Sequence, residues 1–339
     1  MFKTRICDLF GLEYPIVCAG MGVVAMAELA AAVSEAGGLG TIGLAALGRE
    51  GIHNEIAAAR SRTRKPVAVN LLVPFLQPGV VDVLADTPIQ AVTFFWDDAR
   101  GHADSIARLH RAAIKVIWQC GSAEEAQWAK EAGVDAVIAQ GFEAGGHVRG
   151  TVTTFALIPE VRDAIGEMPL IAAGGIADGR GLAAALALGA DGAVFGTRFL
   201  AATESVAHPI YKERILRAHA SQTIHTTLFD IGWPDAPHRV LRTAVVEEWE
   251  KAGRLASGQR PGEGKTVATS RRPDAELPLV NYTVMPPADY LEGDLERLPL
   301  YAGQSCSLVR EIIPAGEIVR RIAAEAREVI AQRLAAMVR

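Results

Sequence analysis

From Pro15 onward, the sequence repeats one unit: a short apolar run, a turn and an Ala-rich stretch of helical character. Eight of the apolar runs are predicted strands: Ile16–Ala19, Leu39–Leu44, Val67–Leu71, Ala91–Phe95, Lys115–Gln119, Ala136–Ala139, Leu170–Ala173 and Gly192–Phe195. These runs are apolar on both faces, as expected where helices cover one side of a sheet and a core fills the other. They predict an α/β fold and fit a closed (β/α)8 TIM barrel better than an open, doubly wound sheet.

The Ala-rich segments between the strands are predicted helices: Ala25–Ala36, Ile52–Arg60, Asp104–Ala113, Ala123–Ala132, Arg180–Leu188 and His208–Ala218. Glycine usually lies between the end of such a helix and the start of the next strand, as at Gly133 and Gly189. Glycine reaches the left-handed conformation without steric cost, so it commonly ends a helix. Periodicity does not reveal whether a sheet closes, so the doubly wound sheet stays open as an alternative.

The repeat stops at residue 220, and we expect the barrel to span residues 1–220. Residues 221–305 are richer in Pro, Gly and charge, which predicts a cap or subdomain that is partly helical around Val240–Lys251. An extended excursion over the barrel surface is the alternative. Residues 306–339 form the third expected segment, where apolar residues at four-residue steps from Pro314 onward predict an amphipathic helix that packs back on the barrel.

The composition excludes several classes of protein. Of the 339 residues 50% are hydrophobic, enough for a large core, and the net charge of -5 gives no basic surface for nucleic acid or anionic membranes. The four cysteines are scattered without a C-x-x-C pair, which argues against disulfides and structural zinc. Since no apolar run approaches the ~20 residues of a membrane span and no signal peptide is evident, we expect a cytoplasmic protein.

Two short motifs suggest nucleotide binding but stand in the wrong context. Gly38–Gly43 fits G-x-G-x-x-G, but it follows a predicted helix and enters a strand, whereas a dinucleotide fingerprint follows a strand and opens a helix. Gly258–Thr266 ends like a P-loop, but Gln259 stands where the first glycine is required and no apolar strand precedes it. Neither motif supports a nucleotide site.

Glycine turns follow the last two predicted barrel strands. Gly174 and Gly175 come directly after the seventh strand, and Gly196 and Thr197 come directly after the eighth. Phosphate-binding barrels commonly use these two loops, because glycine lets main-chain N–H groups approach phosphate oxygens. The turns could instead serve tight chain reversal alone. Their position at two consecutive strand ends favours a phosphate site.

His147 follows a Gly-Gly pair at the exit of the sixth predicted strand, within Gln140–His147. An imidazole on such a loop can approach a planar ligand and can act as an acid, a base or a hydrogen-bond donor near neutral pH. An ordinary surface histidine is the alternative. The other seven histidines, His238 among them, are interpreted as surface or cap residues, and no pair of them has a convincing metal-ligand spacing. We therefore expect no catalytic metal.

A third group of residues suits a flat, polar-edged ligand. Gly20 and Gly22 follow the first strand and would let main chain lie against a ring system. Asn70 ends the third predicted strand and Gln119 the fifth, and their amides can hydrogen-bond the pyrimidine edge of a flavin. Strand-end capping explains the two amides equally well.

Together these motifs resemble the nitronate monooxygenase family, formerly called 2-nitropropane dioxygenases. The resemblance rests on Pro15–Met21, Glu35–Gly40, Glu143–His147, Ala173–Arg180, Gly196–Leu200, Gly232–His238 and Tyr301–Ser305. It implies a TIM barrel with FMN, and His147 as the active-site histidine. It also implies flavin contacts at Gly20, Met21, Gly22, Asn70, Gln119, Gly145, Gly146, Ala173, Gly174, Gly175, Gly196 and Thr197.

The same resemblance implies that alkyl nitronates react with O₂ to give a carbonyl compound and nitrite. His147 would deprotonate a neutral nitroalkane or orient an anionic nitronate. A reductase of quinones or enoyl thioesters that uses NAD(P)H is the nearest alternative, because it shares the barrel and the motifs. A phosphosugar isomerase or lyase without flavin and a non-catalytic flavin-binding module are the remaining hypotheses. Substrate and O₂ are the expected partners.

Overall fold

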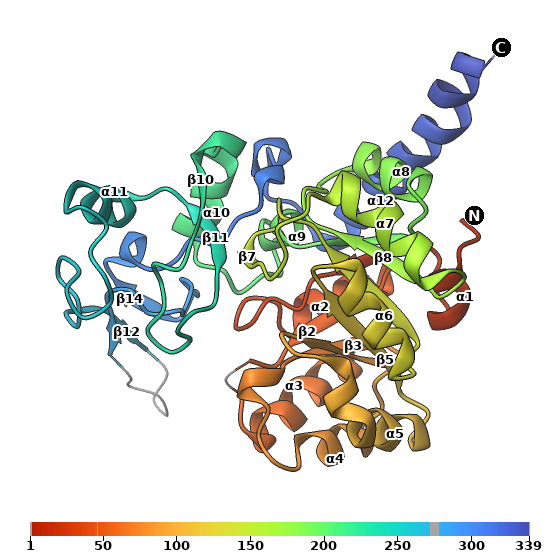
Figure 1. The fold of residues 1–339 in the computed structure, drawn as a ribbon, viewed down its shortest axis with the longest axis horizontal. Coiled ribbons are helices and arrows are strands. Elements are labelled where there is room, and N and C mark those ends of the chain that lie inside the picture. Colours follow the sequence, from red (N-terminus) through yellow and green to blue (C-terminus); the bar gives the residue numbers. More distant parts are fainter. Residues whose placement is uncertain (1, 46, 272–277, 339) are drawn as a thin grey trace.

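The computed structural model of the chain describes residues 2–45, 47–271 and 278–338 (Figure 1). Its main sheet is parallel and eight-stranded, in the order β1-β9-β8-β6-β5-β4-β3-β2. The strands are β1 Ile16–Cys18, β2 Gly40–Gly43, β3 Val67–Leu72, β4 Ala91–Phe95, β5 Lys115–Cys120, β6 Ala136–Gln140, β8 Leu170–Ala173 and β9 Gly192–Phe195. Val17 of β1 pairs in parallel with Leu39, which precedes β2, and the two edges of the sheet thereby meet. The predicted TIM barrel is confirmed, and the doubly wound sheet is excluded.

The helices of the barrel lie between its strands, as the repeat predicts. They are α2 Ala27–Glu35, α3 Arg49–Arg62, α4 Val80–Ala85, α5 Ala103–Arg111, α6 Ala123–Glu131, α7 Thr154–Ile165, α8 Gly179–Ala187, α9 Thr197–Leu200 and α10 Pro209–Arg217. The sequence analysis did not predict α4, α7 or α9, of which α9 has only four residues. Helix α4 has only six residues, and α7 carries Pro159 in its interior, which masks a helical pattern.

The barrel interior changes from apolar to polar along its axis. Its apolar cluster includes Val17, Leu39, Ala68, Ala91, Ile117, Ile138, Ile171 and Val194. Helix α1 (Arg5–Phe10) adds Ile6 and Phe10 to this cluster and so closes the amino end of the barrel. Strand residues alternate between faces, so the residues two positions further on point inward at the carboxyl end. Five of the eight residues at these positions are polar, namely Thr41, Asn70, Thr93, Gln119 and Gln140, and the other three are Ala19, Ala173 and Gly196.

A second part of the molecule packs beside the barrel and contains two small antiparallel sheets (Figure 1). One sheet joins β10 (Thr223–Thr226), β11 (His238–Leu241) and the barrel's own β7 (Gly146–His147). The other consists of β12 Thr266–Ser270, β13 Leu279–Val280 and β14 Leu291–Gly293. Helix α11 begins at Ala244 and ends at Lys251, so the predicted start at Val240 is wrong, because Val240 pairs within β11.

Short 3₁₀ turns complete the connections, at Val73–Phe75, Ala99–His102, Ala220–Gln222, Leu295–Arg297 and Gln304–Leu308. Helix α12 (Ala315–Glu328) buries Ile318, Ile322 and Ala326 in the core that it shares with the barrel helices. From Val329 the chain continues as π and 3₁₀ turns that project from the body, as Figure 1 shows. The predicted packing of Ile330 and Leu334 on the barrel is wrong, since the exposed fraction of the surface is 39% for Ile330 and 41% for Leu334. None of the helices in the described ranges is long and apolar enough to cross a membrane.

Candidate active site

The two glycine turns after the last barrel strands lie side by side at the carboxyl end of the barrel. Gly174 and Gly175 both have left-handed backbones, with φ of 98° and 73°. A Cβ atom on Gly174 would stand 2.8 Å from the carbonyl oxygen of Gly141, so this position requires glycine. Gly196 is different, because its backbone is right-handed and a Cβ there would meet only Ala19 at 3.6 Å. Its missing side chain leaves space open at the barrel mouth.

The neighbouring helix ends differ in what they can bind. At the start of α8, the Gly179 N–H donates to Glu325 Oε2 at 2.7 Å and the Gly181 N–H donates to Asp178 Oδ1 at 3.1 Å. Two carboxylates thus occupy the positive end of α8 and would repel a phosphate. At α9 the Thr197 hydroxyl accepts the Gly303 N–H at 3.0 Å. The turn at Gly196 and Thr197 is therefore the more suitable anion site.

Gly20, the first of the predicted residues at the exit of the first strand, contacts Asn70 directly. An ideal Cβ on Gly20 would stand 2.1 Å from Asn70 Cβ, so the main chain rests on the amide side chain. A Cβ on Gly43 would stand 2.5 Å from the carbonyl oxygen of Met21. These close approaches place Gly20, Met21 and Gly22 over the polar layer at the mouth of the barrel.

Gln140 is a polar group of this layer that the sequence reading did not assign to the site. Its Nε2 donates to the carbonyl oxygen of His147 at 3.1 Å. Its Oε1 is enclosed and has no hydrogen-bond partner among the described residues. A buried acceptor without a donor is costly unless a ligand or water completes it. Gln140 stands two residues after Ile138 in β6, so its side chain points to the same, inner face of the barrel, and this alternation could have identified it from the sequence.

The loop after β6 brings Gly145, Gly146 and His147 to the same edge. A Cβ on Gly145 would stand 2.2 Å from the Gly303 nitrogen, so the loop packs tightly on the segment before α12. Gly146 has a φ of 74°, and a Cβ there would meet no described atom within 4 Å. His147 pairs with His238 in the small sheet, which fixes its backbone. The barrel loop is thus anchored by the cap.

Aromatic rings surround the His147 imidazole. The Trp233 ring stacks on it, with centroids 4.0 Å apart and planes at 30°, and Trp96 stands edge-on at 5.8 Å. Tyr301 lies at 5.6 Å and His238 at 5.3 Å. No residue in the described ranges bonds to His147 Nε2, which is enclosed. Burial, and to a smaller extent His238, lowers the pKa of His147 to about 3, so its ring is neutral at pH 7.

His238 was interpreted as a surface or cap residue, and the surface part of that interpretation is wrong. Its residue is 0% exposed, and its ring closes a loop of the cap. Nδ1 lies 2.9 Å from the carbonyl oxygen of Ala236, and Nε2 accepts the Phe229 N–H at 3.3 Å. These partners fix the neutral tautomer with its proton on Nδ1. Burial lowers the pKa of His238 to about 4.

The sequence profile of the nitronate monooxygenase family matches residues 3–79 and 77–325. The chain belongs to the nitronate monooxygenase family. It is 35% identical over 273 residues to a probable nitronate monooxygenase of Staphylococcus saprophyticus, with 67% of this chain and 76% of that protein covered.

Other relatives of this family member carry different names. The chain is 39% identical over 255 residues to the (3aS,4S,5R,7aS)-5-hydroxy-7a-methyl-1-oxo-octahydro-1H-indene-4-carboxyl-CoA dehydrogenase of Mycobacterium tuberculosis, covering 74% of this chain and 70% of that protein. Among solved structures, FabK from Thermotoga maritima has a TM-score of 0.79 at 36% identity, covering 99% of this chain and 100% of FabK. Nitroalkane oxidase from Streptomyces ansochromogenes has a TM-score of 0.73 at 30% identity, covering 96% and 99%.

The chain is therefore a flavin-dependent oxidoreductase of the nitronate monooxygenase family. Its own residues fit a flavin, because glycine positions open the barrel mouth and Gln140 Oε1 lacks a partner within the described chain. Asn70, Gln119 and Gln140 present amides from the inner wall. The individual flavin contacts named from the sequence stay predictions.

Proposed function

We propose that the protein is an FMN-dependent nitronate monooxygenase, which oxidises alkyl nitronates with O₂ to a carbonyl compound and nitrite. One observation carries this proposal: a buried imidazole that is neutral at pH 7 stands among aromatic rings at the mouth of a glycine-lined barrel. Bound flavin would accept the substrate's electrons and pass them to O₂. The protein's part is to hold both reactants and to exclude water.

Main-chain N–H groups of Gly175, Gly196 and Thr197 would hold the phosphate of the cofactor. The amides of Asn70, Gln119 and Gln140 would bind the polar edge of its ring system. One phosphate site and the absence of a dinucleotide fingerprint from the sequence favour FMN over a dinucleotide. Flavin released by heat should therefore co-migrate with FMN, and co-migration with FAD would refute this part of the proposal.

His147 would orient the substrate and not deprotonate it. A group with a pKa of about 3 is a weak base, so it removes the α-proton of a neutral nitroalkane poorly. A neutral imidazole can still donate one hydrogen bond to a nitronate oxygen, and such bonds to charged groups are among the stronger ones. The proposal therefore favours the preformed anion as the substrate.

A second candidate is oxidoreduction of an acyl thioester, with NAD(P)H as the other reactant in the reductive direction. The support for it is the 39% identity to a protein named as a carboxyl-CoA dehydrogenase. The same His147 hydrogen bond would polarise a thioester carbonyl as well as bind a nitronate oxygen. A quinone reductase is a variant of this candidate.

Anaerobic stopped-flow mixing separates the candidates. The flavin-loaded enzyme is mixed in turn with propane-2-nitronate, NADH and NADPH, and flavin absorbance is followed. We expect rapid bleaching by the nitronate, followed by recovery and nitrite release when O₂ is admitted. Bleaching by NADPH or NADH alone, with reoxidation by crotonyl-CoA or a quinone, would establish the second candidate and refute the first.

A further inference from the structure

Three aromatic side chains from separate segments form one cluster beside His147, in which Trp96 and Trp233 contact the imidazole and Phe75 contacts Trp233. Phe75 follows β3, Trp96 follows β4, and Trp233 stands in the cap loop before β11. The ring of Trp233 lies 4.9 Å from Phe75, edge to face, and 4.9 Å from Trp96. Trp233 is only 6% exposed, whereas Phe75 is 41% exposed, so the cluster runs from the surface inward to His147.

The backbone at Trp96 is held in an unfavourable conformation. Its φ is 82°, a left-handed value that bulky residues rarely adopt. Such strain persists only where the surroundings impose it, and it concentrates at functional sites. The indole of this residue contacts both Trp233 and His147.

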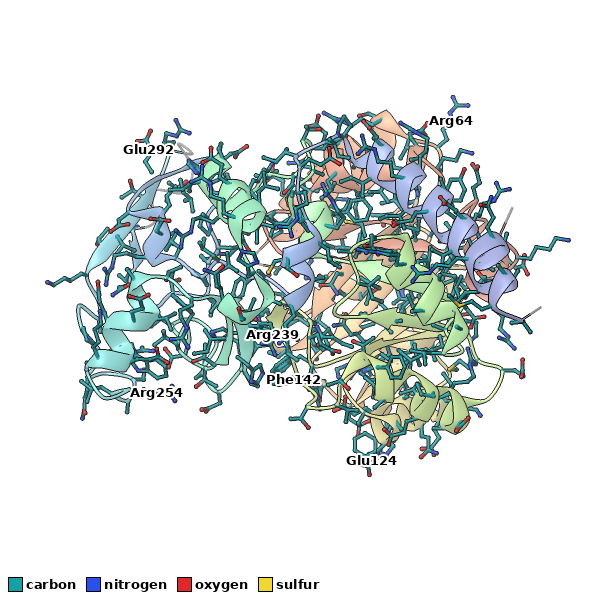
Figure 2. All side chains as sticks on the ribbon, turned by 90° about the horizontal axis from the view of Figure 1, so that it is seen from above. Arg64, Glu124, Phe142, Arg239, Arg254 and Glu292 are labelled. Carbon is teal, nitrogen blue, oxygen red and sulfur yellow. The ribbon has the colours of Figure 1, made fainter. Side chains whose placement is uncertain are left out.

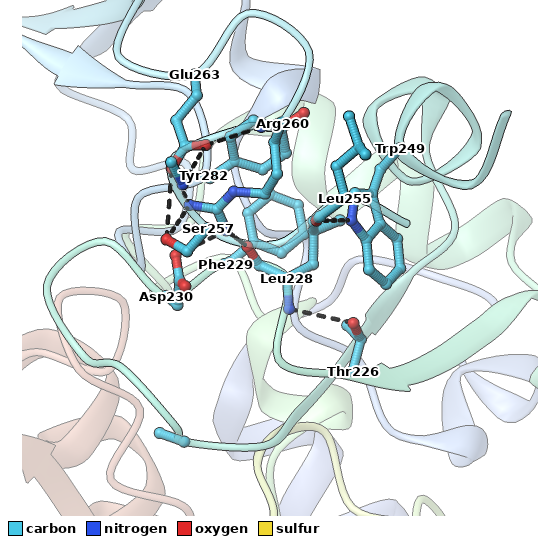
Figure 3. A network of polar contacts seen from close by, with 12 residues as sticks. Thr226, Leu228, Phe229, Asp230, Trp249, Leu255, Ser257, Arg260, Glu263 and Tyr282 are labelled. Carbon is cyan, nitrogen blue, oxygen red and sulfur yellow. Dashed lines mark hydrogen bonds and ion pairs between the residues drawn. The ribbon is translucent and has the colours of Figure 1, made fainter. Parts of the chain in front are cut away.

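The loop that carries Trp233 is fixed at both ends. Arg260 has a side chain that is 2% exposed, and its Nη1 lies 2.6 Å from the Leu228 carbonyl oxygen and 2.7 Å from Asp230 Oδ1 (Figure 3). Glu263 forms an ion pair with Nη2 of the same guanidinium. At the far end, the His238 ring closes the loop as described above. The position of Trp233 is therefore built into the cap.

We propose that Trp233 determines substrate specificity: with Trp96, whose ring plane stands at 67° to its own, it forms an apolar corner beside His147 that selects substrates with a planar aryl or alkenyl group next to the anionic head. This inference rests on the proposed function, because it takes His147 as the contact for that head. Any group bonded to His147 lies within reach of both indoles, since their centroids are 4.0 Å and 5.8 Å from the imidazole. Flat groups stack on indoles better than puckered rings of equal size do.

Binding of two matched acids tests the proposal without turnover. Benzoate and cyclohexanecarboxylate carry the same planar anionic head as a nitronate and rings of similar size, but only benzoate is flat. Calorimetry on the flavin-loaded enzyme should show benzoate binding about threefold to tenfold more tightly, the range that one aromatic contact contributes. Trp233→Leu should abolish this preference, and Trp233→Phe should keep most of it.

Two further variants guard against a folding defect. Trp249→Phe removes a cap tryptophan whose Nε1 bonds to the Leu255 carbonyl oxygen, and it should leave the preference unchanged. Phe75→Leu removes an exposed ring that packs against Trp233. This variant should keep its full flavin content and should show a smaller preference for benzoate than the wild type. Equal affinities of the wild type for the two acids, no binding of either, or an unchanged preference in Trp233→Leu would overturn the proposal. A clear preference in an enzyme that does not oxidise nitronates would refute the proposed function and leave this inference standing.

Discussion

Glu143 accepts the main-chain N–H of Thr154 through Oε2 at 2.8 Å and thereby caps the start of α7. The Thr154 hydroxyl lies 3.0 Å from the same oxygen and donates to the carbonyl oxygen of Gly174 at 2.8 Å. One residue therefore connects the loop that carries Gly145 and His147 to the glycine turn after β8. The start of the same loop is held by the cap, because Arg239 Nη2 donates to the Phe142 carbonyl oxygen at 2.8 Å, at the junction of the cap and the barrel (Figure 2).

The first prediction concerns this connection. Thr154→Val keeps the shape but removes the hydroxyl, so flavin affinity should fall by about twofold to tenfold, the worth of one hydrogen bond. Thr154→Ser keeps the hydroxyl and should bind flavin as the wild type does. Quenching of flavin fluorescence during titration gives both dissociation constants. Equal affinities in the two variants would mean that Thr154 does not position the turn.

The second prediction tests the opening at Gly196. Gly196→Ala meets only an ordinary contact at 3.6 Å and no left-handed backbone, so the stability of the protein should change little. Flavin affinity should fall at least tenfold if a phosphate approaches the N–H here. Gly101→Ala is the matched control, because a Cβ there meets no described atom within 4 Å. Unchanged flavin retention in Gly196→Ala would place the phosphate elsewhere.

The third prediction concerns the role of His147. Removing one donor to a charged group should lower kcat/KM for propane-2-nitronate by about tenfold to a hundredfold in His147→Ala, and His147→Gln should recover part of it. Because burial lowers the pKa of His147 to about 3, the wild-type profile should be flat between pH 6 and 8. Neutral 2-nitropropane should be a poor substrate throughout. An inflection near pH 6.5 that is absent from His147→Gln would instead identify His147 as a base.

The fourth prediction follows from the buried histidines. The folded-state pKa of His238 is lowered to about 4, so the folded state favours the neutral ring. The free energy of unfolding is therefore unaffected by this histidine above pH 6.5, and it decreases as the pH falls from 6.5 towards 4, because the unfolded state binds a proton that the folded state does not. For His238 alone the loss at pH 5 is about 2 kcal/mol, from 1.36 kcal/mol per pKa unit. Urea unfolding at pH 7 and pH 5 should show it.

His238→Asn serves as the comparison for that measurement. It should be less stable at pH 7, because the cap loop loses its closure, but its stability should change less between pH 7 and pH 5. An identical pH dependence in the variant and the wild type would contradict the assignment of a neutral, buried His238.

The fifth prediction concerns the C-terminal extension. A chain that ends at Glu328 should keep its flavin content and lose less than about 1 kcal/mol of unfolding free energy, because Ile330, Leu334 and Met337 are exposed. Ile322→Ala, by contrast, removes a side chain that is 3% exposed and should cost about 2–5 kcal/mol. A large loss on truncation would show that residues beyond Glu328 pack against the protein in solution.

Local pattern was enough to predict the strands, their parallel order and the glycine turns at their ends. Residues 170–173 and 192–195 were predicted with the bounds that the structure gives, because an apolar run between turns needs only its neighbours to be recognised. Gly174 could be singled out for the same reason, since its left-handed backbone is a property of one residue and its turn.

Only the tertiary structure decided whether the sheet closes, which takes the pairing of Val17 with Leu39. It also decided the surroundings of His147, because Trp96 and Trp233 come from segments far apart in sequence and meet it only in the folded chain. Burial is a property of the whole packing, so neither the lowered pKa of His147 nor the enclosed position of His238 is encoded in local periodicity. The sequence determined which residues reach the barrel mouth, and packing between barrel and cap determined what His147 can do there.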